Sequence, residues 1–111
     1  MTAPLPPASF RMDLAWMHET VDRVLDEEST AGPEEIGDLM LLLRGQNLEL
    51  VAELIKRAMG APSAADQSLI RKARAMRDLE TPAELIPAVR HLRQMASINR
   101  DLLTALERLR C

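Results

Sequence analysis

The chain has 111 residues, of which 47% are hydrophobic and 28% are charged. This length fits one domain, and this composition is that of a globular protein and excludes a disordered one. Aromatic residues make up only 2% of the chain. The core must therefore be built from aliphatic side chains and methionine, which favours helices over sheets.

The net charge is −3, but it is divided unevenly along the chain. Residues 1–55 carry three basic and eleven acidic groups, whereas residues 56–111 carry eleven basic and six acidic groups. We expect the acidic and basic halves to pack side by side and to neutralise each other in part. The alternative is a basic binding face in the second half.

No secretory or membrane signal is readable. The start of the chain lacks the charged and apolar regions of a signal peptide. The longest unbroken apolar run, residues 39–43, is far shorter than the roughly 20 residues that span a bilayer. The single cysteine, Cys111, cannot form an internal disulfide, which is typical of a reducing compartment. We expect a cytoplasmic protein with no membrane partner.

The first nine residues, which include Pro4, Pro6 and Pro7, predict a flexible Pro-rich arm, and residues 10–111 predict a single helical bundle domain. A first helix is expected at about 10–28. Its apolar stripe, at spacings of three and four, consists of Leu14, Met17, Val21 and Val24. Met12 and Trp16 lie off this stripe, where either the arm or a partner covers them.

A second helix is predicted from Pro33 to about Met59, ended by Gly60-Ala61-Pro62. Its main apolar stripe consists of Ile36, Met40, Leu43, Leu50 and Leu54. A second stripe beside it consists of Leu41, Leu48 and Ile55. Gly45 interrupts this helix at a cost of about 1 kcal/mol relative to alanine, which predicts a close approach of another helix.

A third helix is predicted at about 64–79, opened by a capping box from Ser63 to Asp66. A second capping box, from Thr81 to Glu84, opens a fourth helix that reaches Leu109. Pro87 lies about a turn and a half inside the fourth helix. Either this helix begins at Pro82 and kinks at Pro87, or its regular part begins at Pro87. Its apolar arc covers about half the circumference and consists of Val89, Leu92, Met95, Ala96, Ile98, Leu102, Leu103, Leu106 and Leu109.

Short connections make neighbouring helices antiparallel, so we predict an all-α, up-down-up-down antiparallel four-helix bundle. One buried face needs an apolar arc of roughly 100°, and the second and fourth helices exceed it. Their surplus must be covered by each other, by a ligand or by another chain.

No catalytic or metal-binding pattern is present. A di-metal site in a helical bundle needs Glu-x-x-His pairs, but the residues three before His18 and His91 are Ala15 and Ala88. We therefore expect no enzyme activity, no metal and no cofactor. Nucleic acid is disfavoured as a partner because the chain is acidic overall and has no helix-turn-helix or aromatic platform. A contact with phosphates needs only positive charge, and it could use the basic residues Arg71, Lys72, Arg74, Arg77, Arg90, Arg93 and Arg100.

Asparagines occupy the centres of two apolar stripes, Asn47 in the second helix and Asn99 in the fourth. A buried amide is costly unless it is hydrogen-bonded. The two amides either bond each other, a backbone carbonyl or a water and fix the helix register, or they orient a small ligand. The candidate pocket lies between these helices and would be lined by Gln46, Asn47, His91, Met95 and Asn99, with Met40 beside them.

Four segments resemble a family of short, uncharacterised helical proteins of actinobacteria that are labelled as natural-product biosynthesis proteins. These segments are Val24-Leu25-Asp26-Glu27-Glu28, Leu43-Arg44-Gly45, Lys72-Ala73-Arg74 and Ala88-Val89-Arg90-His91-Leu92. The resemblance covers about residues 13–106. The family often has His directly after the Leu-Arg-Gly element, where this chain has Gln46. The resemblance implies an accessory or regulatory role and no particular reaction.

Together these patterns predict a non-catalytic accessory or regulatory binding protein that acts through helix–helix contact, with itself as a homodimer or with a protein partner. The expected interface consists of Met12, Trp16, Leu41, Leu48, Ile55 and Met59. One alternative is a small-molecule-binding bundle, and a further one is a nucleic-acid-associated regulator that uses the basic face of the third and fourth helices.

Overall fold

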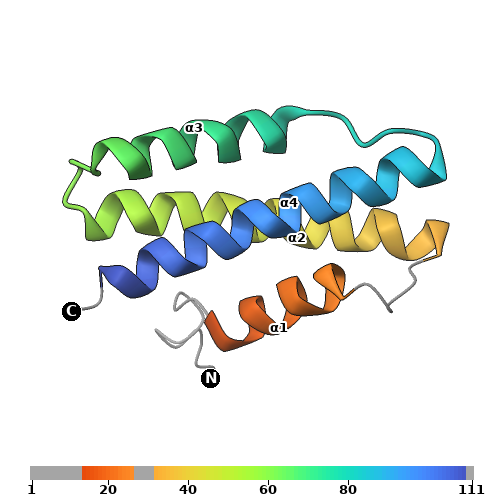
Figure 1. Ribbon diagram of the computed structural model, residues 1–111, viewed down its shortest axis with the longest axis horizontal. Coiled ribbons are helices and arrows are strands. Elements are labelled where there is room, and N and C mark those ends of the chain that lie inside the picture. The colour runs from red at the N-terminus through yellow and green to blue at the C-terminus, as the bar shows by residue number, and fades with distance from the viewer. Residues whose placement is uncertain (1–13, 27–31, 110–111) are drawn as a thin grey trace, which may run out of the picture.

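The computed structural model describes residues 14–26 and 32–109. These residues form four helices and no strand: α1 (Leu14–Leu25), α2 (Pro33–Arg57), α3 (Ala64–Asp78) and α4 (Leu85–Arg108). Successive helices run in opposite directions (Figure 1). The predicted all-α, up-down-up-down four-helix bundle is therefore confirmed. The expected Pro-rich arm and Met12 lie outside the described residues.

The central helix of the bundle is α4. It packs against all three other helices, whereas α3 packs against α2 and α4, and α1 packs chiefly against α4. Helices α2 and α4 run in the same direction and cross in the middle of the bundle (Figure 1). This placement explains the wide apolar arc of α4, because a helix with three neighbours needs three apolar sides. Of the three ways to cover that arc, coverage by the other helices is the one observed on α4.

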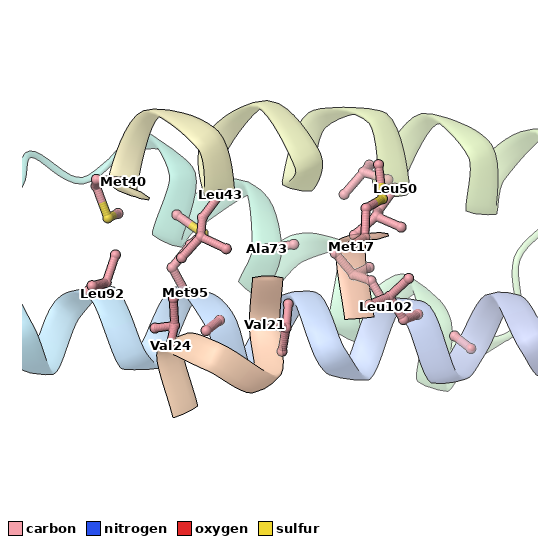
Figure 2. Close-up of a cluster of buried hydrophobic side chains, with 14 of the residues drawn as sticks. Met17, Val21, Val24, Met40, Leu43, Leu50, Ala73, Leu92, Met95 and Leu102 are labelled. Atoms are coloured by element: carbon pink, nitrogen blue, oxygen red, sulfur yellow. The ribbon is translucent and has the colours of Figure 1, made fainter. Parts of the chain in front are cut away.

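The core is aliphatic and joins all four helices. Met40 of α2 lies opposite Leu92 of α4, and Leu50 lies opposite Leu102 farther along the same two helices (Figure 2). Helix α3 contributes the small Ala73, and α1 contributes Met17, Val21 and Val24. Burying one Leu, Met or Val side chain stabilises the fold by about 1.5–3 kcal/mol, so these buried aliphatic and methionine side chains hold the described helices together.

Helix α2 begins and ends with the expected residue types. Pro33 occupies the first turn, where a missing amide hydrogen costs nothing. The helix ends at Arg57, two residues before the predicted end, and Met59 and Gly60 both have positive φ values, 54° and 79°. The amide of Gly60 donates to the carbonyl of Ile55 at 3.0 Å, which closes the helix end. Met59 is thus outside the helix.

The other helix boundaries confirm one predicted cap and correct another. The Ser63 hydroxyl accepts a hydrogen bond from the Asp66 amide at 3.2 Å, so α3 begins as predicted. Helix α4 begins at Leu85, between the two predicted starts, with Glu84 as its N-cap. A start at Leu85 places Pro87 in the first turn, where it interrupts no helical hydrogen bond. The predicted Thr81 cap is wrong, since the Thr81 hydroxyl instead accepts a hydrogen bond from Arg44 at 3.1 Å.

Helix α1 is shorter than expected at its C-terminal end, because Asp26 already lies outside it. The imidazole of His18 lies 2.6 Å from the Glu107 carboxylate and links α1 to the end of α4. Among the described helices, none has both the length and the apolar character needed to span a bilayer.

Candidate functional site

The most exposed apolar side chains in the middle of a helix lie on the side of α2 that faces away from α4. Leu41 is 70% exposed and Leu48 is 56% exposed, and both lie well inside a 25-residue helix. Gly45 and Ala52 are also exposed. Gly45 comes four residues after Leu41, and Ala52 comes four residues after Leu48, which places all four residues on one side of the helix. We call Leu41, Gly45, Leu48 and Ala52 the outer α2 face.

Two predicted interface residues, Ile55 and Met59, differ from Leu41 and Leu48 in their surroundings. Ile55 is half-buried and packs against the core, so only part of its side chain is available. Met59 is 90% exposed but lies beyond the end of α2 with a left-handed backbone. Met59 therefore does not share a helical face with Leu41 and Leu48. Of the predicted second stripe of α2, Leu41 and Leu48 remain fully available.

The prediction that Gly45 allows a close approach of another helix is wrong within the chain. A Cβ atom built on Gly45 would meet nothing within 4 Å, and the same holds for Gly37. Both positions are helical and open to solvent. No packing inside the described bundle therefore accounts for a glycine at position 45.

The two asparagines lie where α2 and α4 cross, and both are fully buried. The Asn99 amide donates to the backbone carbonyl of Leu43 at 3.0 Å. The Asn47 amide donates to the carbonyl of Ala73 at 3.4 Å and to the Met95 sulfur at 3.5 Å. Each asparagine thus bonds a backbone carbonyl of another helix, one of the predicted alternatives. Their Oδ1 atoms have no hydrogen-bond partner among the described residues.

The remaining candidate ligand residues are buried but lie on different sides of this crossing. Gln46 is 3% exposed, and neither amide atom has a hydrogen-bond partner among the described residues. It lies one turn from Leu42 and two turns from Leu39, both of which line a cleft beside α1. His91 lies beside Arg44 of α2, and burial, followed by the Arg44 charge, lowers the pKa of His91 below 6.5. The structure therefore brings together Asn47, Asn99 and Met95, with Gln46 and His91 to either side.

Arg44 links α2 to the connection between α3 and α4. Its guanidinium donates to the carbonyl of Leu79 at 2.7 Å and to the Thr81 hydroxyl at 3.1 Å. Burial, and in addition the charge of this nearby cation, lowers the pKa of His91 and favours the neutral form of its imidazole. The Nε2 atom of this buried imidazole has no hydrogen-bond partner among the described residues.

A cleft beside α1 contains Trp16, another predicted interface residue. The part between α1 and α2 has a volume of about 160 Å³. It shares Arg23 and Leu39 with a smaller hollow of about 30 Å³ that reaches Val89 and Arg93 of α4. The surface beyond it includes the exposed Leu85 and Ile86. Sequence reasoning missed these two residues because they precede Pro87, where the regular apolar pattern of α4 had not begun.

The residues of the predicted basic face of the third and fourth helices are not equally exposed, since Arg90 and Arg100 of α4 are exposed and Arg77 is half-buried. Arg71, Lys72 and Arg74 are exposed on α3, whereas Arg93 lies in the hollow beside Arg23 of α1. In the described part of the chain, no group of three or more His, Cys, Asp or Glu side chains is placed to hold a metal ion.

Comparison with known proteins places the chain in a family without assigning it an activity. The family described as "Family of unknown function (DUF6415)" matches residues 15–111, a range that includes nearly all of the four helices. The searches of curated proteins and of solved structures returned no match. The expectation that the chain belongs to an uncharacterised family is thereby confirmed, and that family is the family of unknown function DUF6415.

Proposed function

We propose that this protein is a non-catalytic accessory or regulatory binding protein, and that it acts by packing the outer α2 face against an apolar helix of a partner. The observation that carries the proposal is the exposure of Leu41 and Leu48 in the middle of the second helix. Leucines at these positions contribute little to the isolated bundle, since neither is among its buried core residues.

The shape of the outer α2 face suits a helix. Gly45 and Ala52 alternate with the two leucines, so small and large side chains follow each other at the three–four spacing of helix pairs. A partner helix can approach closely over Gly45, where the nearest atoms leave open space. Covering apolar surface contributes about 25 cal/mol per Å², so the exposed leucines supply the driving force and the small residues supply the fit.

Photo-cross-linking tests the proposal. A photoreactive amino acid is placed at position 48 in one variant and at the exposed Asp101 of α4 in a matched control. We expect discrete cross-linked species from position 48 in the cells of origin, lost when Leu41→Glu is added, and none from position 101. Equal labelling from both positions, or none from position 48, would refute the proposal.

A small molecule bound where α2 and α4 cross is a second candidate. The observation that favours it is the pair of buried Oδ1 atoms of Asn47 and Asn99, which have acceptor capacity unused by the described residues. A ligand at a hundred times its Kd would stabilise the protein by about 2.7 kcal/mol. A thermal-shift screen of metabolites therefore tests this function, and Asn99→Leu should abolish any shift.

The setting of the protein is also part of the proposal. We place it in the cytoplasm, in keeping with its single cysteine, and in natural-product biosynthesis of actinobacteria, in keeping with the resemblance of its four segments. For nucleic acid as the further alternative, retention on heparin at physiological salt is the check.

A further inference from the structure

We propose that the helix which covers the outer α2 face is α2 of a second copy of this chain, packed antiparallel about a twofold axis. This inference rests on the proposed function, because it names the partner of the same surface. It is carried by the order of large, small and charged residues along α2.

The outer α2 face is complementary to itself when one copy is reversed. In an antiparallel helix pair, residues lie opposite each other when their numbers have a constant sum. With a sum of 93, Leu41 lies opposite Ala52 of the second copy, and Gly45 lies opposite Leu48. Every layer then joins one leucine to one small residue. The axis passes level with residues 46 and 47, close to the middle of the 25-residue helix, so the two helices overlap over most of their length.

The charges beside this face follow the same symmetry. Asp38 and Lys56 are exposed and lie 18 residues apart, which is five turns, so they occupy the same edge of the face. Their numbers sum to 94. The antiparallel pair therefore sets Asp38 of each copy against Lys56 of the other, once at each end of the contact.

A parallel pair lacks both features. It would place Gly45 opposite Gly45 and Ala52 opposite Ala52, which leaves two layers without a large side chain. It would also separate Asp38 of one copy from Lys56 of the other by about 27 Å along the axis, at 1.5 Å per residue. The sequence of the face thus selects the antiparallel arrangement.

The size of the contact indicates a weak dimer. A single pair of helices with four such layers buries less than the roughly 1,200 Å² of a stable interface. We expect a reversible dimer whose population rises with protein concentration.

Sedimentation equilibrium of the full chain, over a concentration range and with a reductant to keep Cys111 from cross-linking, tests the inference. Wild type should show a monomer–dimer equilibrium, and Leu48→Glu should remain monomeric with unchanged helicity. Asp38→Lys and Lys56→Glu should each weaken the dimer by about tenfold at low salt, because each replaces two attractive pairs by two repulsive ones.

Mixing the two charge variants, Asp38→Lys and Lys56→Glu, is the decisive step. In the antiparallel dimer of one with the other, the two substituted positions face each other with opposite charges. The two unchanged positions, Lys56 of the first variant and Asp38 of the second, also form an attractive pair. An equimolar mixture should therefore regain the wild-type affinity. Glu49→Lys, outside these pairs, is the matched control and should not be rescued by Lys56→Glu.

Three results would overturn the antiparallel self-pairing: a monomeric wild type, a dimer insensitive to Leu48→Glu, or no rescue in the mixture. Persistent cross-links from position 48 to a different protein, with a monomeric wild type, would leave the proposed function standing and overturn only the second copy as partner.

Discussion

Replacing Gln46 by methionine is expected to stabilise the protein. The Gln46 side chain is 3% exposed, and neither its amide nitrogen nor its carbonyl oxygen has a hydrogen-bond partner among the described residues. Methionine has nearly the same length and shape and no polar group to bury. The substitution therefore removes an unsatisfied amide without removing any described hydrogen bond.

The magnitude follows from the cost of an unsatisfied buried polar group, which is about 1–3 kcal/mol. We expect a gain of about 2 kcal/mol in the free energy of unfolding, which for a chain of this length raises Tm by roughly 8 °C. Thermal and urea unfolding followed by circular dichroism measure both quantities. Gln94→Met, at an exposed position of α4, is the control and should change the stability by less than about 0.5 kcal/mol.

A lower or unchanged stability of Gln46→Met would refute this reasoning. It would mean that the Gln46 amide is satisfied in solution, by water or by a ligand, and that the position beside the α1–α2 cleft is polar by requirement. A raised stability accompanied by loss of cross-linking from position 48 would instead connect Gln46 with the outer α2 face on the opposite side of the helix.

Three further outcomes are expected. Because the folded-state pKa of His91 lies below 6.5, the unfolded state takes up the proton first as the pH falls, so the free energy of unfolding should drop below pH 6.5 and level off below the folded-state pKa. Unfolding of His91→Asn across pH 5–8 should lack this part of the dependence of stability on pH, and an unchanged dependence would contradict the prediction. Met59→Gly should raise the free energy of unfolding by about 0.5–1 kcal/mol, because φ is +54° there, and a lower Tm would count against a left-handed Met59. Arg108→Ala should lower the free energy of unfolding by about 1 kcal/mol, since the Arg108 guanidinium donates to the buried Asp66 carboxylate at 2.8 Å. Urea unfolding of this variant and of Arg100→Ala, an exposed control, measures the difference, and equal effects would show that the contact does not stabilise the protein.

The fold could be predicted because helical periodicity records which side of each helix is apolar. The main stripe of α2 is buried as expected, and so is the stripe of α1 apart from the half-buried Leu14. Periodicity does not record which helices share a face. The wide arc of α4 therefore looked like surplus surface, whereas in the structure three neighbouring helices cover it.

The helix ends show a second limit. Thr81 has the spacing of a capping box, yet its hydroxyl accepts a hydrogen bond from Arg44 of α2. Helix α4 begins only at Leu85, two residues before Pro87. Met59 is the predicted end of α2, but the helix ends at Arg57 and Met59 has a positive φ. Both errors arise because a local pattern competes with a contact or a backbone conformation that only the folded chain contains.

The sequence predicted which residues of the candidate site are buried, but not their hydrogen-bond partners. Asn47 and Asn99 were placed in apolar stripes by spacing, and they do lie together at the α2–α4 crossing. Spacing could not tell that each amide would bond a backbone carbonyl and leave its Oδ1 without a partner among the described residues. Those outcomes depend on how α2, α3 and α4 pack around the two side chains.

Gly45 connects these considerations with the proposed function. A glycine inside an exposed helix costs about 1 kcal/mol relative to alanine, and here a Cβ atom would meet nothing within 4 Å. The isolated bundle thus gains no contact that offsets this cost. A facing leucine, brought by another helix, would use the space that the missing side chain leaves. The glycine and the exposed leucines beside it then have one common explanation. In the monomer the glycine is unfavourable and the leucines contribute little to stability, whereas across an antiparallel pair they are complementary.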